Sequence, residues 1–155
     1  MSTQTKNVNA SADTTTHITR IFCARRQRVY AAWTNLELLR QWWGPEGVET
    51  HELVFEARVG GKFRWVLSTP EDERMTIRGE FHEVRSGEKL VFTWQSDHRD
   101  MENSETIVTI EFREKNAITT ELHLTHEDLP SEASRDEHTA GWNSALDKLD
   151  HLLTD

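Results

Sequence analysis

The segment RQWWGPEGVE, residues 40–49, separates a stretch with helical hydrophobic spacing from a long stretch with the spacing of strands. Before it, apolar residues recur with the i, i+3, i+4, i+7 spacing of an amphipathic helix, at Val29, Ala32, Trp33 and Leu36. Asn35 is expected to end that helix or to cap a second short helix that reaches Trp43. Gly44 can take the left-handed conformation that ends a helix, and Pro45 prevents the helix from resuming.

After Pro45, six segments alternate apolar and polar residues and are rich in β-branched and aromatic side chains, which is typical of strands. They are residues 50–57, 62–68, 74–84, 89–96, 105–114 and 117–127. Turn-forming segments separate them, so neighbouring strands are expected to be antiparallel and to form a meander. Residues 17–24, HITRIFCA, have a similar pattern and predict a further strand that joins this sheet.

One face of the predicted sheet is apolar, because large side chains alternate with charged ones along each strand. The inward positions are Leu53, Phe55, Phe63, Trp65, Leu67, Met75, Ile77, Gly79, Phe81, Leu90, Phe92, Trp94, Val108, Ile110, Phe112, Leu122, Leu124 and His126. The cover for this face is expected from a helix over residues 131–153, with Ser131 as its N-cap. Its apolar stripe comprises His138, Trp142, Ala145, Leu149, and Leu152 or Leu153.

These elements predict an α+β helix-grip fold, in which a curved antiparallel sheet wraps around the long C-terminal helix, with two short helices after the first strand. At ~1.5 Å per residue that helix could cross the whole sheet. A straight helix cannot contact a curved sheet along its full length, so the arrangement favours an internal cavity.

Composition predicts a single domain over residues 17–155, preceded by a disordered polar tail over residues 1–16. With 18 Lys and Arg against 27 Asp and Glu, the net charge is −9, which disfavours nucleic acid and anionic membranes as partners. The chain has no secretory signal pattern and no apolar run near the ~20 residues that span a bilayer, so a cytoplasmic location is expected. Its single cysteine, Cys23, is expected to fill space within the first strand.

The sequence predicts neither a metal site nor a cofactor. There are eight histidines, but His123 and His126 point to opposite faces of a strand, and the others lack the spacing of ligands. Gly60 and Gly61 lie between two predicted strands, where a hairpin turn explains them better than a phosphate loop.

Several short segments, in this order, resemble one known family: VYAAWTNLELLRQWWGPEG, RVGGKFRW, GEFHEV, KLVFTW, ETIVTIEF, LTHE and HTAGWNSALDKL. The resemblance is to the activator of heat-shock protein 90 ATPase homologue-like family, which belongs to the START-related (SRPBCC) superfamily of polyketide cyclases, pollen allergens and lipid-transfer domains. It spans roughly residues 17–153. It implies a START-like fold with a deep hydrophobic cavity used for binding, and chemistry in only some relatives.

A small hydrophobic or aromatic ligand is therefore the expected partner. Its candidate binding residues are Trp43, Phe63, Trp65, Phe81, Phe92, Trp94, His126 and Trp142. Adjacent helical positions point about 100° apart, so one of Trp42 and Trp43 is expected to seal the core and the other to lie at the cavity mouth. Recognition is expected to depend mainly on shape and stacking.

Two alternatives stay open. A cavity enzyme of cyclase, hydratase or dehydratase type could use His126 or His138 as a general base, although both are expected to be structural because no inward carboxylate orients them. Arg20 is a third polar candidate, expected to be an ion-pair partner at a strand end. A chaperone-regulator role is the other alternative, although the chaperone-binding domain of eukaryotic relatives has no room in this chain. A homodimer also stays open.

Overall fold

The computed structural model describes residues 14–98 and 104–154. It contains a seven-stranded antiparallel sheet with the strand order β1-β7-β6-β5-β4-β3-β2. The elements in chain order are β1 (Thr16–Phe22), α2 (Arg26–Thr34), α3 (Leu36–Leu39), β2 (Glu49–Phe55), β3 (Lys62–Ser68), β4 (Arg74–Arg85), β5 (Lys89–Ser96), β6 (Thr106–Asn116), β7 (Thr119–Glu127) and α4 (Glu132–Thr154). The predicted helix-grip fold is thus confirmed, with both short helices after the first strand.

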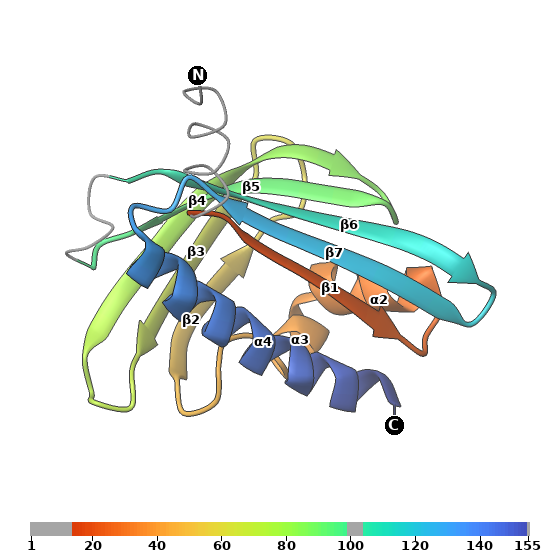
Figure 1. The fold of residues 1–155 in the computed structure, drawn as a ribbon, viewed down its shortest axis with the longest axis horizontal. Coiled ribbons are helices and arrows are strands. Elements are labelled where there is room, and N and C mark those ends of the chain that lie inside the picture. Colours follow the sequence, from red (N-terminus) through yellow and green to blue (C-terminus); the bar gives the residue numbers. More distant parts are fainter. Residues whose placement is uncertain (1–13, 99–103, 155) are drawn as a thin grey trace, which may run out of the picture.

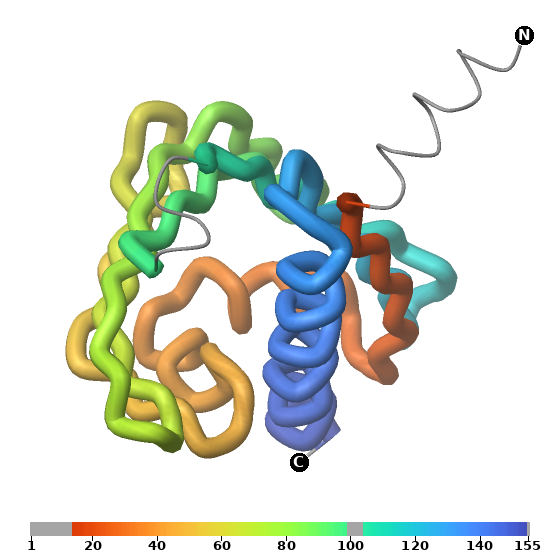
Figure 2. Tube along the Cα trace, turned by 60° about the vertical axis from the view of Figure 1, so that its left-hand side comes forward, coloured from red at the N-terminus to blue at the C-terminus, as the bar shows by residue number. Residues whose placement is uncertain are grey.

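The sheet curves around α4 (Figures 1 and 2), and α2 and α3 occupy the same concave side. β1 pairs with β7, so the first strand closes one edge of the meander and β2 forms the other edge. Register shifts in the β2–β3, β4–β5 and β6–β7 pairs add local bends to the strands.

β1 begins at Thr16, one residue before the predicted domain start, because Thr16 pairs with His126 of β7; its side chain is buried against α4. Its Oγ1 lies 3.2 Å from the Arg135 carbonyl oxygen and 2.9 Å from Thr139 Oγ1. Residues 1–13 of the predicted tail lie outside the described residues. The prediction for Cys23 is wrong: β1 ends at Phe22, and Cys23 is exposed in the bend that follows.

Asn35 performs both of its predicted roles. Its backbone N–H donates to the Ala31 carbonyl at the end of α2, and its side-chain oxygen accepts the backbone N–H groups of Glu37 and Leu38 at 3.0 and 3.3 Å. One residue therefore ends α2 and caps α3. Ser131 caps α4 as expected, because its Oγ accepts the backbone N–H of Ser134 at 3.1 Å.

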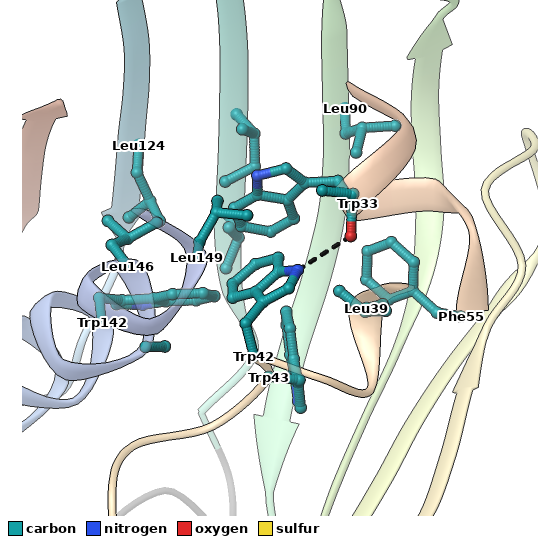
Figure 3. Close-up of a cluster of buried hydrophobic side chains, with 14 of the residues drawn as sticks. Trp33, Leu39, Trp42, Trp43, Phe55, Leu90, Leu124, Trp142, Leu146 and Leu149 are labelled. Carbon is teal, nitrogen blue, oxygen red and sulfur yellow. Dashed lines mark hydrogen bonds between the residues drawn. The ribbon is translucent and has the colours of Figure 1, made fainter. Parts of the chain in front are cut away.

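Trp42 belongs to the core. Its ring is fully buried, and its Nε1–H donates to the Ala32 carbonyl at 2.9 Å, as the dashed line in Figure 3 shows. The carbonyls in the last turn of a helix lack intrahelical partners, so Trp42 satisfies one such group at the end of α2. The Trp33 ring packs against Trp42 with ring centroids 4.7 Å apart.

We expect Trp42→Phe to lower the free energy of unfolding by ~1–3 kcal/mol more than Trp33→Phe, because only the first change leaves a buried carbonyl without its donor. The control is matched: both rings are fully buried, and Trp33 Nε1 has no hydrogen-bond partner in the described part of the chain. Urea denaturation of both variants measures the difference. Equal losses would show that the Trp42 hydrogen bond contributes nothing.

Candidate functional site

A cavity of about 250 Å³ lies between α4 and strands β3, β4 and β5. α4 makes its main contacts with β1 and α2, and the space remains where the sheet curves away from the helix. The lining residues are Trp43, Gly44, Pro45, Val48, Trp65, Leu67, Thr69, Met75, Ile77, Trp94, Glu137, His138, Gly141, Trp142 and Ala145. An adjoining surface depression also contains Glu71 and Glu73. The residues that it shares with the cavity are Pro45, Thr69, Met75, Ile77, Glu137, His138 and Gly141. We refer to the shared boundary as the mouth.

The predicted ligand-binding residues divide into two groups. Trp43, Trp65, Trp94 and Trp142 line the cavity. Phe63, Phe81, Phe92 and His126 do not; they are buried beside or behind it. The three phenylalanines pack around Phe55, with ring centroids 5.9, 4.9 and 5.5 Å from it. The alternation identified the apolar face of each strand but not which positions on that face border the cavity.

Other lining residues were not among the predicted site residues. Leu67, Met75 and Ile77 stood on the predicted inward face, but their nearness to the cavity follows from where the sheet leaves α4. Gly141 belongs to α4 and lines the cavity beside Pro45. Glu137 lies at the mouth, and its proximity to His138 in sequence was the signal that could have identified it.

Trp43 is the ring that connects the walls of the cavity. Its centroid lies 5.6 Å from Trp65, 5.7 Å from Trp142 and 6.3 Å from Trp94. Figure 3 shows Trp42 between Trp33 and Trp43. Trp42 is packed in the core and Trp43 lines the cavity. The predicted helix to Trp43 is wrong, because α3 ends at Leu39, so the 100° helical offset does not explain this division.

His126 on β7 is the centre of a directed chain of hydrogen bonds. Trp142 Nε1 donates to His126 Nδ1 at 3.1 Å. Thr106 Oγ1 donates to the Trp94 carbonyl at 2.6 Å, so at the 2.8 Å contact the hydroxyl accepts from His126 Nε2. The ring is therefore neutral, with its proton on Nε2 and both nitrogens occupied. Burial, with a smaller effect from His138, holds the pKa of His126 well below its usual range.

His138 on α4 differs from His126 in that, among residues 14–98 and 104–154, only one of its ring nitrogens has a hydrogen-bond partner. Its Nδ1 lies 2.8 Å from the Ser134 carbonyl oxygen, which can only accept, so Nδ1 carries the proton. In the neutral ring Nε2 then holds a lone pair, and His138 lines the cavity. The two histidine rings meet edge to face, with centroids 4.9 Å apart. Burial lowers the pKa of His138, opposed by the Ser134 carbonyl and by Glu137.

Arg20 lies outside the cavity lining and links β1 to α4. Its guanidinium lies 2.8 Å from the Asp147 carboxylate and 3.1 Å from the Asn143 side-chain oxygen. The described residues contain no group of three or more histidine, cysteine, aspartate or glutamate side chains placed to hold a metal ion. No helix in the described part of the chain is both long and apolar enough to cross a membrane.

The family model described as Activator of Hsp90 ATPase homolog 1-like protein matches residues 24–154. The chain belongs to this family. Among solved structures, protein CV1439 from Chromobacterium violaceum is similar with a TM-score of 0.83 and 24% identity, over 92% of this chain and 98% of that one. The AHSA1 protein from Silicibacter pomeroyi has a TM-score of 0.80 and 26% identity, over 90% and 97% of the two chains.

A more distant similarity concerns DynU16, a putative protein in the dynemicin biosynthetic locus, with a TM-score of 0.73 and 18% identity over 90% of this chain and 47% of that chain. At this identity the likeness shows the fold alone. No curated protein matches the chain. Membership of the Activator of Hsp90 ATPase homolog 1-like family thus agrees with the resemblance in the sequence and with the helix-grip fold.

The depressed pKa of His126 makes the stability of the protein dependent on pH. In the unfolded chain His126 titrates near 6.5, and in the folded chain well below that value. Below about pH 6.5 only the unfolded state binds this proton. The free energy of unfolding therefore decreases as the pH is lowered, by up to about 1.4 kcal/mol per pH unit for this group.

We expect His126→Gln to be less stable than the wild type at about pH 7, and the gap to narrow toward about pH 5, because glutamine does not titrate. Denaturant unfolding across this range measures the gap. The matched control is His151→Gln, an exposed position on α4. Parallel stability curves for wild type and His126→Gln would contradict the assignment of His126 as a buried neutral ring.

Proposed function

We propose that this protein binds a small hydrophobic or aromatic molecule in the cavity between the sheet and α4. The observation that carries the proposal is the cavity itself, whose walls include four of the six tryptophans of the chain. Engineered apolar cavities of about 150 Å³ take up benzene, so a space of about 250 Å³ is large enough for a molecule of two fused rings. Rigid indole rings supply contact area for stacking.

The packing around Gly141 supports the view that the cavity is a feature of the fold and not a packing defect. Protein interiors contain few voids larger than a water molecule. Glycine within a helix costs roughly 0.5–1 kcal/mol relative to alanine. A Cβ at Gly141 would meet only Pro45 Cγ, at 3.9 Å, so packing does not require glycine here. The chain therefore accepts a less stable helix at a position where a side chain would enter the cavity mouth.

Family membership adds a second, independent support, because proteins of this fold family commonly bind ligands in a cavity. A role as a chaperone regulator has support only in the description of the family. A cavity role predicts binding of small molecules by the isolated chain, which the chaperone role does not require.

We expect Gly141→Leu to weaken binding of neutral aromatic molecules at least tenfold, because the new side chain would occupy the mouth of the cavity. Replacing glycine in a helix should leave the melting temperature unchanged or raise it. Tryptophan fluorescence during ligand titration reports binding, since four indoles line the cavity. Ala133→Leu is the matched control, because Ala133 is an exposed position of α4 outside the lining. Unchanged affinity in Gly141→Leu would show that these molecules do not bind in this cavity.

A cavity enzyme is the second candidate, favoured by His138, which lines the cavity and holds a lone pair on Nε2. His138 is the better base of the two histidines, because both nitrogens of His126 are occupied. In that case His138→Gln should abolish turnover of an identified substrate while leaving the melting temperature nearly unchanged. His126→Gln should instead lower stability by ~1–3 kcal/mol. Normal turnover in His138→Gln would remove this candidate.

A further inference from the structure

We propose that the ligand is a neutral aromatic molecule carrying a hydroxyl or N–H group, which donates a hydrogen bond to His138 Nε2 inside the cavity. This inference rests on the proposed binding function and names the chemical class of the ligand. It changes the expectation that shape and stacking are the main basis of recognition, because it assigns one directed polar contact.

The direction of that contact follows from the partner of the other ring nitrogen. Ser134 O can only accept, so His138 Nδ1 donates to it and the neutral ring can only accept at Nε2. A ligand donor is therefore matched there, whereas an ether or carbonyl oxygen would face a lone pair. Burial of the ring keeps it neutral at neutral pH, despite the opposing effects of the Ser134 carbonyl and Glu137.

The indole N–H groups of the cavity walls do not serve as hydrogen-bond donors to a ligand. Trp142 Nε1 is bonded to His126, and Trp65 Nε1 donates to Thr50 Oγ1 at 3.0 Å. The Nε1 atoms of Trp43 and Trp94 are buried and inaccessible, without a partner in the described part of the chain. Ligand acceptors thus find no exposed indole donor, and His138 provides the directed acceptor.

The charges at the mouth disfavour acidic ligands. Glu137 borders both the cavity and the depression, and Glu71 and Glu73 line the depression. His98 also lies there, 3.9 Å from the Glu73 carboxylate. Among the described residues that line either space, none is a lysine or an arginine. A ligand carboxylate would meet like charges without a cation to pair with, which selects a neutral alcohol over a carboxylic acid.

The test compares three two-ring probes that differ at one position: 2-naphthol, 2-methoxynaphthalene and 2-naphthoic acid. Dissociation constants are measured by equilibrium dialysis with the wild type and with His138→Phe, which keeps an aromatic ring but lacks the acceptor. His151→Phe, the same change at an exposed position of α4, is the control. Comparing the naphthol-to-methoxynaphthalene ratio in the two proteins isolates the hydrogen bond from the size of the methyl group.

We expect the wild type and His151→Phe to bind 2-naphthol roughly tenfold more tightly than 2-methoxynaphthalene, and His138→Phe to bring this ratio near one. 2-Naphthoic acid should bind more weakly than the two neutral probes to the wild type and to both variants. Equal binding of the two neutral probes by the wild type would overturn the role of His138 but leave cavity binding intact, whether or not the variant folds. Preference for the acid would overturn the charge argument. Failure of all probes to bind the wild type would overturn both this inference and the proposed function.

Discussion

The hydrogen-bond chain through His126 is the constraint on which the cavity depends. It runs from Trp142 on α4 through His126 on β7 and Thr106 on β6 to the carbonyl of Trp94 on β5. Two of the four tryptophans that line the cavity, Trp142 and Trp94, are thereby connected to the buried ring of His126. Each link has one donor and one acceptor, so a change at any member leaves another buried group without a partner, which costs more than the bond itself contributes. These hydrogen bonds connect α4 to strands β5, β6 and β7 of the curved sheet.

The two inward histidines show how one residue type acquires two roles. His126 is fully buried with both nitrogens bonded, and His138 is half-buried with one nitrogen bonded to its own helix. Burial lowers the pKa of both, so both are neutral near neutral pH. Of these two rings, His138 alone has a nitrogen without a hydrogen-bond partner among the residues that the structure describes, and it lines the cavity. The difference depends on whether the second nitrogen has a partner, which neither composition nor spacing reveals.

The sequence predicted the elements of the fold more fully than the site, and the reason is the range of the forces involved. Helix capping by Asn35 and the alternation of the strands are local, and both were confirmed. The site depends on where the sheet separates from α4, which is a property of the whole sheet. Phe81 and Phe92 therefore stood beside Met75 and Ile77 as equal inward positions, although only the second pair lines the cavity. The prediction for Cys23 was wrong for a local reason, because β1 ends at Phe22, one residue before Cys23.

The size of the cavity follows from small residues placed against large rigid ones. A Cβ at Gly44 would lie 2.9 Å from Trp65 Cζ2, and Gly44 has a φ of +86°, so this position combines a left-handed turn with close contact to an indole. Across the space, Gly141 and Ala145 leave room beside the larger side chains of α4 that line the cavity. Indole rings have few rotamers, and those of Trp65 and Trp142 are further held by hydrogen bonds to Thr50 and His126. These two indole rings are therefore held in position at the edge of the space, and a ligand that enters it would find them already ordered, which lowers the entropic cost of binding.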